Sequence, residues 1–391
     1  MNNFWVKALS LMIVLPAFFS LTLVQAQINS TGETDGRVNT VYTSIPFLRI
    51  NPDARTGGMG DVGLAISPDP AAIYWNASKL AFTENQLGLS LTYTPWLREL
   101  VDDIYIAHLS SYYKLDDLQT IAASIRYFSL GLIQFTDINA EPVGEFNPRE
   151  LAVDVAYARK LGDKVSLGLT LKYIYSNLAA GQSANGDIIT AANAVAGDLS
   201  FYYTNDMEFG GRDANLSFGA ALTNVGNKVS YTDTDKKDFI PINLGIGSAF
   251  TMYFDDYNKL TFAFDVNKLM VPTPDPEDTE GTFRDKAVIS GMLGSFGDAP
   301  GGFSEEIKEL MYSFGLEYWY NNQFSVRLGH YNEHKLKGNR KYLTVGLGLK
   351  YNVFGLNFSY IVPTSNQRNP LDNTLRFSLV FNFNGEEAAN F

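Results

Sequence analysis

The sequence predicts an all-β protein, a closed antiparallel transmembrane β-barrel of about 14 strands. Three observations lead to this prediction. Apolar residues alternate with small or polar ones at a period of two. Most of these alternating segments run for nine to fourteen residues, whereas a soluble strand averages about 5–6 and about 9–11 tilted residues cross a bilayer. The spacers between the segments alternate between short and long.

The composition agrees with a barrel and argues against other classes. Of 391 residues, 18% are charged and 14% are aromatic, which does not suit a disordered chain. Lys and Arg number 30 against 42 Asp and Glu, so a nucleic-acid partner is not expected. Cysteine is absent, which excludes disulfides, thiolate nucleophiles and cysteine-based metal sites.

Residues 1–26 are expected to form a secretory signal peptide. Lys7 supplies the positive region, residues 9–19 are mostly apolar, and Val24-Gln25-Ala26 fits the small-residue cleavage pattern. The mature chain is then expected to start near Gln27, with an uncleaved anchor helix as the alternative. After residue 26 no apolar run reaches the roughly 18 residues of a membrane helix. The mature protein is therefore expected to be periplasmic, secreted or an outer-membrane barrel.

Residues 27–82 precede the first clear strand and are expected to form a hatch or plug. A barrel of about 8 strands is filled by side chains and one of roughly 16–18 holds an aqueous channel, so an intermediate lumen should be plugged or hold a ligand. The segment is rich in Pro and Gly and includes a short apolar stretch at 71–75. We expect an irregular segment that ends in a short helix. The alternative is a periplasmic tail.

Residues 83–391 are predicted to form the barrel itself. In 341–351, for example, one face is apolar and the other carries Thr, Gly and Lys, which suits a lipid-facing side and a polar lumen. The predicted strands are 86–94, 103–114, 119–136, 149–160, 165–177, 195–205, 214–230, 239–253, 258–270, 310–320, 323–333, 341–352, 354–363 and 373–383.

The spacers predict the orientation of the barrel. The short ones are 115–118, 161–164, 206–213, 254–257, 321–322 and 353. The longer ones, which alternate with them, are 95–102, 137–148, 178–194, 231–238, 271–309, 334–340 and 364–372. Outer-membrane barrels have short periplasmic turns and longer extracellular loops. The long set is therefore expected outside the cell, with both chain termini in the periplasm.

The spacer 271–309 is exceptionally long and is expected to carry function. Connections of this length are usually functional or disordered, and its apolar side chains disfavour disorder. Either it contacts a partner or it folds over the barrel's own mouth. For the partner-contact reading, the candidate anchors are Pro272, Pro274, Phe283, Phe296 and Phe303.

No motif predicts a cofactor, a metal site or an enzyme. Gly58, Gly60 and Gly63 match G-x-G-x-x-G, but turn-like residues precede them in place of the strand that a dinucleotide site requires. A tight backbone packed inside the barrel is expected there instead. His330 and His334 lack a third metal ligand. A lipid hydrolase would rest on His108 and two nearby serines, and a porin on a row of inward Arg or Lys that is not visible in the strands.

The N-terminal segment resembles the signature of the PorV/PorQ family, within the broader group of FadL-like barrels. The residues that carry the resemblance are 47–65, which read FLRINPDARTGGMGDVGLA, and 69–80, which read DPAAIYWNASKL. FadL-like chains often have Asn-Pro-Ala where this chain has Asn76-Ala77-Ser78. The candidate plug residues within the signature are Asn51, Pro52, Arg55, Gly58, Gly60 and Asn76.

The resemblance implies a non-enzymatic adaptor, integral to the bacterial outer membrane and part of type IX protein secretion. Such proteins dock at the SprA-type translocon barrel and bind the C-terminal signal domains of cargo. They then deliver the cargo to a surface attachment complex that contains a PorU-type sortase. Besides these partners, outer-membrane lipid is expected around the barrel. The alternative is a FadL-like transporter of hydrophobic small molecules.

Overall fold

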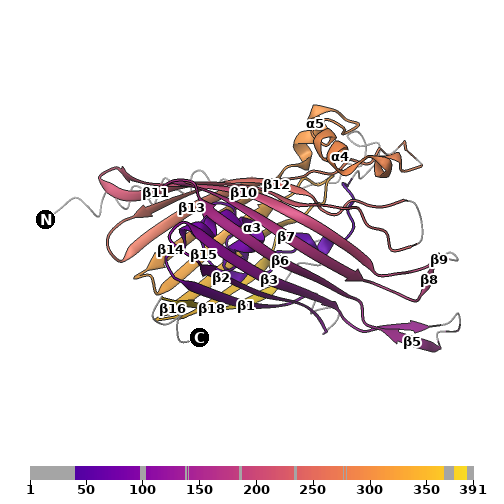
Figure 1. Ribbon diagram of the computed structural model, residues 1–391, viewed down its shortest axis with the longest axis horizontal. Helices are drawn as coiled ribbons and strands as arrows, with labels where there is room; N and C mark the ends of the chain where they lie inside the picture. Colours follow the sequence, from indigo (N-terminus) through magenta and orange to yellow (C-terminus); the bar gives the residue numbers. More distant parts are fainter. Residues whose placement is uncertain are drawn as a thin grey trace. The chain divides into compact units, whose positions relative to one another are not determined.

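A computed structural model shows fourteen antiparallel strands that close into a barrel (Figure 1). The structure describes residues 40–96, 103–136, 139, 141–184, 187–232, 236–275, 277–278, 280–364 and 374–384. Strands that follow one another along the chain pair with one another, and β1 pairs with β18 to close the barrel. The predicted signal peptide 1–26 and the first part of the predicted plug lie outside the described residues.

The closed fourteen-stranded barrel predicted from the sequence is confirmed. Each predicted segment contains one barrel strand, because the period-two pattern fixes which face each residue occupies. The barrel strands are β1 (Leu87–Pro95), β2 (Ile104–Lys114), β3 (Gln119–Leu130), β6 (Arg149–Lys160), β7 (Val165–Asn177), β10 (Ala192–Phe209), β11 (Arg212–Gly226), β12 (Asn243–Tyr253), β13 (Asn258–Leu269), β14 (Met311–Tyr320), β15 (Phe324–Asn332), β16 (Lys341–Tyr351), β17 (Phe354–Pro363) and β18 (Leu375–Phe383).

Several strand boundaries differ from the prediction at glycine and proline positions. The predicted strand 119–136 breaks at Gly131, whose φ of 80° ends the extended run. The following β4 (Ile133–Thr136) pairs with β5 (Pro142–Phe146) in a separate hairpin, and β8 (Ser183–Ala184) pairs with β9 (Asp187–Ile188) in a second one. Strand β10 is longer than predicted, because the turn to β11 is only the pair Gly210 and Gly211, both at positive φ. Conversely, β12 starts four residues late, after Pro241.

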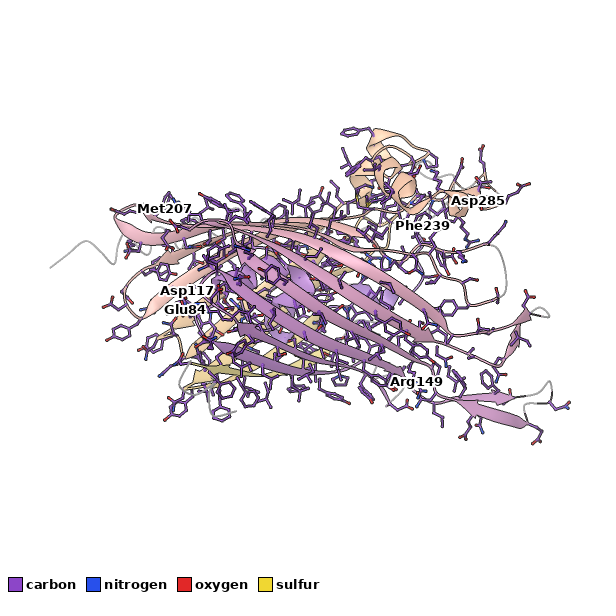
Figure 2. The ribbon with its side chains drawn as sticks, in the orientation of Figure 1. Glu84, Asp117, Arg149, Met207, Phe239 and Asp285 are labelled. Carbon is purple, nitrogen blue, oxygen red and sulfur yellow. The ribbon has the colours of Figure 1, made fainter. Side chains whose placement is uncertain are left out.

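The two faces of the wall differ as the alternation predicts. Outward side chains are apolar and exposed, as with Leu171 at 63% and Val195 at 62% exposure, and Figure 2 shows side chains covering the outside of the barrel. Inward side chains are mostly Ser, Thr, Gly or charged residues and are buried, as with Ser166 and Thr170. An apolar outer band and a polar interior are typical of an outer-membrane barrel.

The connections sort to the two ends of the barrel. Hairpins β4–β5 and β8–β9 lie at the same end as α4 and α5, and the tight turn between β10 and β11 lies at the other (Figure 1). We call these the long-loop end and the short-turn end. The first residue of β1, Leu87, pairs with Phe383 of β18, so both outer strands of the chain meet at the short-turn end.

The helices are short, and they lie in two groups. In the described part of the chain, no helix has the length and apolar character to cross a membrane. In the N-terminal region they are η2 (Pro46–Arg49), α2 (Ala54–Gly57), α3 (Ala72–Trp75) and η3 (Ala77–Phe82). Between β13 and β14 they are η4 (Thr282–Asp285), α4 (Val288–Gly294), α5 (Phe303–Glu306) and η5 (Ile307–Glu309).

Residues 40–83, here called the lumen segment, lie against the inner wall of the barrel. Helix η3 packs on β6, β7 and β10, whereas α2 packs on β16, β17 and β18, on the other side. The backbone N–H of Gly60 donates to the inward Thr344 hydroxyl at 2.8 Å, and that of Ala54 donates to Ser378 at 3.0 Å. The segment thus spans the lumen between opposite walls.

Candidate functional site

The long connection 271–309 is folded and held to the barrel by buried ion pairs. Lys268, at the end of β13, pairs with Glu306 at 3.1 Å and also with Glu309. Lys337, from the loop after β15, pairs with Glu309 at 3.0 Å and with Glu305. These ion pairs fix α5 and η5 to the end of β13 on one side and to the loop after β15 on the other.

A second set of contacts holds the first half of the connection. The Lys228 ammonium donates to the Arg284 carbonyl at 2.7 Å, and Arg284 pairs with Asp238. A Cβ on Gly291 of α4 would lie 2.8 Å from Phe239 and 2.9 Å from Pro272, so α4 sits directly on both. These contacts give the connection a defined surface.

The five predicted anchors occupy different environments. Pro272 is buried under α4, and Pro274 and Phe283 are half-buried. Phe296 and Phe303, by contrast, are 54% and 79% exposed. In this fold Pro272 therefore supports the connection, whereas the two phenylalanines are available for contact.

Phe296 and Phe303 belong to a larger set of exposed apolar residues on this connection that the sequence analysis did not single out. Ile289 and Leu293 are one helical turn apart on α4, and Phe296 follows just after its end. Phe303 and Ile307 follow on α5 and the start of η5. All five are at least 46% exposed. We call Ile289, Leu293, Phe296, Phe303 and Ile307 the loop apolar patch.

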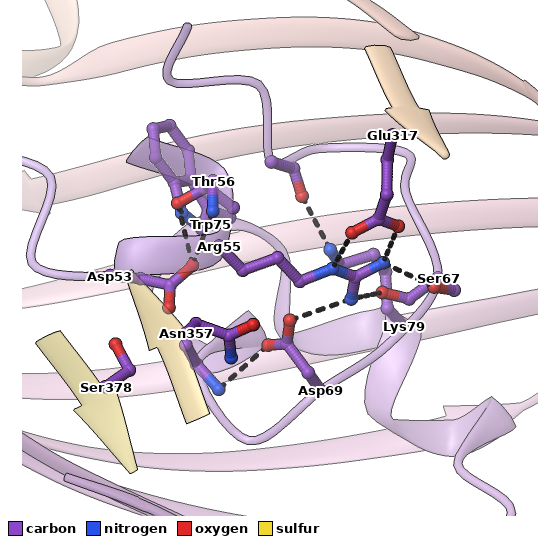
Figure 3. A network of polar contacts seen from close by, with 12 residues as sticks. Asp53, Arg55, Thr56, Ser67, Asp69, Trp75, Lys79, Glu317, Asn357 and Ser378 are labelled. Atoms are coloured by element: carbon purple, nitrogen blue, oxygen red, sulfur yellow. Dashed lines mark hydrogen bonds and ion pairs between the residues drawn. The ribbon is translucent and has the colours of Figure 1, made fainter. Parts of the chain in front are cut away.

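Inside the barrel, Arg55 is the centre of a buried ionic network (Figure 3). Its Nε and Nη2 donate to the two carboxylate oxygens of Glu317 at 2.9 and 2.8 Å. Its Nη1 donates to Asp69 at 2.9 Å, and Ser67 accepts from the same guanidinium. Glu317 also accepts from Arg327 Nε at 2.7 Å. The bidentate pair joins α2 of the lumen segment to β14 of the wall.

Burial lowers the pKa of the cations in this region, whereas nearby carboxylates raise it. Burial alone would lower the pKa of Arg55, but Glu317 and Asp69 outweigh it and raise that pKa above its ordinary value. Lys79, at the start of η3, has no carboxylate partner as close. Its ammonium donates to the Gly63 carbonyl at 2.6 Å, and burial lowers its pKa to about 8. Arg55 is thus held in its charged form by its carboxylate partners.

The other candidate plug residues are buried as well, each with a structural task. Asn51 accepts from the Asp53 N–H at 2.9 Å and from the Thr56 hydroxyl, and the adjoining Pro52 is buried. Asn76 caps η3 and donates to the carbonyls of Leu64 and Phe201, both at 2.9 Å.

The glycines of the lumen segment allow close backbone approach. Gly60 has a φ of 70°, and a Cβ there would lie 2.5 Å from the His330 nitrogen. On the wall, a Cβ on Gly329 would lie 1.9 Å from the Gly60 nitrogen. A Cβ on Gly58 would likewise lie 2.9 Å from the Cα of Gly346. The glycine motif therefore serves packing against β15 and β16 in this structure.

A second ionic network lies toward the long-loop end. Glu333 pairs with Arg340 and, at 3.2 Å, with Arg49 of the lumen segment. Burial alone would raise the pKa of Glu333, but the two guanidinium groups outweigh it and hold that pKa at about 2. A cavity of about 90 Å³ beside this network is lined by Arg49 and Arg340 together with Tyr331 and Tyr342.

The charged residues on the inner wall were missed by sequence reasoning. No row of inward Arg or Lys was visible, yet Arg126, Arg327 and Arg376 are among the largest fully buried side chains. Each strand contributes only one such residue, on β3, β15 and β18, so no single segment shows a ladder. The available signal was a lone charge at an inward position of an otherwise apolar strand, as with Glu317.

The described residues show no metal or hydrolase constellation. No group of three His, Asp or Glu side chains in the described ranges is placed to hold a metal ion. His108 and Ser110 are buried on the inner wall, and neither His108 Nδ1 nor Ser110 Oγ has a hydrogen-bond partner there.

Comparison with known proteins gives one family match and several structural resemblances. The profile of the family described as "Type IX secretion system protein PorV" matches residues 33–276. No curated protein matches the chain.

Among solved structures, the Pseudomonas putida toluene transporter TodX is 11% identical, covers 84% of this chain and 98% of its own, and has a TM-score of 0.49. The Ralstonia pickettii toluene transporter TbuX is also 11% identical, with coverages of 85% and 98% and a TM-score of 0.47. A Pseudomonas aeruginosa FadL homologue is 10% identical, with coverages of 88% and 99% and a TM-score of 0.43.

Proposed function

The chain belongs to the family of the type IX secretion system protein PorV, and from this premise we propose that it is an outer-membrane adaptor for secreted proteins. In this proposal the chain docks at the SprA-type translocon barrel and binds the C-terminal signal domain of cargo. It then delivers the cargo to the attachment complex that contains the PorU-type sortase. The role is one of binding and transfer, without a chemical step.

The orientation proposed for this role follows the two ends of the barrel. The apolar outer face suits surrounding lipid, and longer loops are extracellular in outer-membrane barrels. The long-loop end is therefore placed outside the cell, with connection 271–309 at the surface. The proposed plug is the lumen segment, because it spans the lumen and pairs with the wall through Arg55 and Glu317. Cargo is then expected to be handled at the surface of the barrel and not through its lumen.

The observation that carries the proposal is the loop apolar patch. Large exposed apolar clusters mark interaction sites, and aromatic side chains often dominate binding energy. This patch stands on folded helices held by Lys268 and Lys337, so little ordering entropy is lost on binding. It lies on the connection between β13 and β14, at the long-loop end of the barrel.

A paired charge substitution tests the adaptor role. Phe296→Asp with Phe303→Asp places two charges in the patch, and hot-spot residues of this kind cost about 2 kcal/mol or more each when they are lost. We expect cells carrying this variant as their only copy to lose surface display of cargo while the barrel stays folded and inserted. Whole-cell protease shaving measures display, and heat-modifiable migration in gels reports the barrel.

The matched control is Tyr257→Asp, which changes a 58% exposed aromatic residue at the short-turn end. It should leave display intact. Normal display in the paired variant, with equal capture of a purified cargo C-terminal domain, would contradict the adaptor role of the patch. A loss of display with unchanged capture would instead assign the patch to the translocon or to the attachment complex.

Transport of hydrophobic small molecules remains the second candidate from the sequence. It requires a continuous apolar passage, whereas the inner wall is lined by Ser, Thr, Gly and paired charges such as Arg55 with Glu317. Purification of the barrel from its membrane discriminates the two: a lone barrel enriched in one fatty acid favours transport, whereas co-purified translocon or cargo favours the adaptor, whether or not a lipid is bound.

A further inference from the structure

A cavity of about 500 Å³ opens at the short-turn end, on the far side of the lumen segment from the loop apolar patch. Pockets of roughly 300–1,000 Å³ hold small molecules. Its lining includes Arg55 and Asp69 from the lumen segment, and strand ends that lead into short turns, among them Tyr253, Lys259 and Lys350. We call this cavity the vestibule. The proposed adaptor role does not use this cavity.

One wall of the vestibule is cationic and aromatic. Lys259 and Trp319 are opposite each other on β13 and β14, and the lysine ammonium lies 5.9 Å from the centre of the indole ring. The Arg327 guanidinium lies 5.5 Å from the same ring. Lys350 completes this wall from the end of β16. Two cations therefore lie near one indole ring, and a third lines the same cavity.

These cations have unused hydrogen-bonding capacity. Lys259, which is half-buried, and Lys350, which is exposed, form no ion pair with any described residue. Arg327, with its side chain 0% exposed, donates Nε to Glu317 and Nη1 to Asn357 at 2.9 Å. Its Nη2 has no partner within the described ranges. A buried cation without full pairing is costly unless something else satisfies it.

The fold makes room for this arrangement. A Cβ on Gly348 would lie 2.3 Å from Ser325 Oγ and 2.8 Å from Arg327 Nη1, so the absent side chain gives the guanidinium room there. Most acidic residues of the lining are already engaged, and Glu84 and Glu317 lie near enough to Lys259 to act on its charge. Asp69 pairs with Arg55, Asp53 accepts from Thr56 N–H and hydroxyl, and Glu84 is exposed. The free charge of the vestibule is therefore positive on the Trp319 side.

We propose that the vestibule binds a small oxyanion, a phosphate or carboxylate head group attached to an apolar or aromatic portion. The head group binds Lys259 and Lys350 through charge-assisted hydrogen bonds, and the buried guanidinium of Arg327 lies beside the same Trp319 ring. The apolar portion lies along Trp319. A ligand of this chemistry comes either from lipid or from a soluble periplasmic ester or acid.

Calorimetric titration of the full-length barrel in dodecyl maltoside tests the proposal. The probes are inorganic phosphate, glycerol phosphate, decyl phosphate and decanoate. We expect saturable binding of at least one probe below about 10 mM, and about tenfold weaker binding in Lys259→Gln and in Lys350→Gln, since each loses one charge-assisted hydrogen bond. Neither substitution leaves a buried carboxylate without its cation, so both variants should fold.

Lys164→Gln is the matched control, because Lys164 is an exposed lysine of a short turn at the same end and does not line the vestibule. This variant should bind the probes with the same affinity as the parent. Preference for the decyl probes identifies a lipid source, and equal affinity for glycerol phosphate identifies a soluble one. The proposal is overturned if no probe binds saturably, or if the Lys259 and Lys350 variants bind as the parent does.

Discussion

Replacing Arg55 by Met should loosen the lumen segment without unfolding the barrel. The guanidinium joins α2 to β14 through two bonds to Glu317, of 2.9 and 2.8 Å, and holds Asp69 at 2.9 Å. Methionine keeps much of the volume but none of the donors. The strand ladder of the barrel does not depend on this side chain.

The structure gives the size of the effect. Removing one partner of a buried ion pair costs about 3–5 kcal/mol. The lower end applies here, because Glu317 keeps Arg327 Nε at 2.7 Å and so remains paired. A loss of about 3 kcal/mol multiplies the population of the loosened state by roughly 150.

The absence of cysteine makes the assay direct. Ala65→Cys places one thiol at a 0% exposed position of the lumen segment, so maleimide reacts only when the segment opens. The labelling rate in the Arg55→Met background should rise by about 150-fold over the parent. Lys286→Met is the control, since its pair with Asp298 is 41% exposed on the lysine side and worth little.

The result that refutes this reasoning is a labelling rate within about threefold of the parent in a folded barrel. It would mean that backbone packing alone holds the lumen segment and that the Arg55 network contributes nothing to its retention. A labelling rate raised equally by Lys286→Met would locate the effect in the barrel and not in the network.

Three further predictions use the same chain. Gly329→Ala puts a Cβ 1.9 Å from the Gly60 nitrogen, so it should displace the lumen segment and raise cysteine labelling by about tenfold or more. Glu333→Gln should reduce thermal stability at neutral pH. Because the pKa of Glu333 in the folded protein, about 2, lies below the ordinary 4.5, its contribution to stability is full above pH 4.5 and is lost as the pH falls toward 2. The melting curves of variant and parent should therefore converge near pH 2. Lys268→Met leaves Glu306 without its cation and should accelerate tryptic cleavage within 271–309 by about a hundredfold.

Each of these predictions has its own control. Gly162→Ala has no atom within 4 Å of the added Cβ and should label like the parent. Equal labelling of both glycine variants would contradict the close-approach argument. A constant difference between the Glu333→Gln and parent melts down to about pH 2 would show that its charge is not what stabilises the protein. Lys335→Met changes an exposed lysine near Lys337, and cleavage as fast as in Lys268→Met would deny the anchoring role of the buried pair.

Barrel architecture was predictable because it depends on local pattern. Alternation alone assigns each strand residue to lipid or lumen, so the strands around Leu171 and Leu347 were recognised without knowing their neighbours. Boundary errors occurred where a single backbone conformation decides the outcome, as at Gly131, whose positive φ no hydropathy pattern reveals. The turn of Gly210 and Gly211 likewise depends on positive φ angles that no hydropathy pattern reveals.

The placement of the candidate anchors was only partly predictable. Aromatic content in 271–309 marked the connection as a contact region, and Phe296 and Phe303 are exposed there. Pro272 is buried, because α4 folds back onto it through Gly291. The helical turn that places Ile289 and Leu293 on one side of the connection depends on α4, within a stretch that was expected to be mostly loop.

By itself, the sequence determined the class of this protein: a cysteine-free membrane barrel, its strand number, the alternation of short and long connections, and the signature of its family. Only the tertiary structure decided which charges meet. Arg55 and Glu317 are 262 residues apart and bond only because the barrel closes around the lumen segment. Lys259, Arg327 and Lys350 likewise stand on different strands and share one cavity through strand tilt and closure. Periodicity is a local property of a strand, whereas a buried charge network is a property of the closed surface.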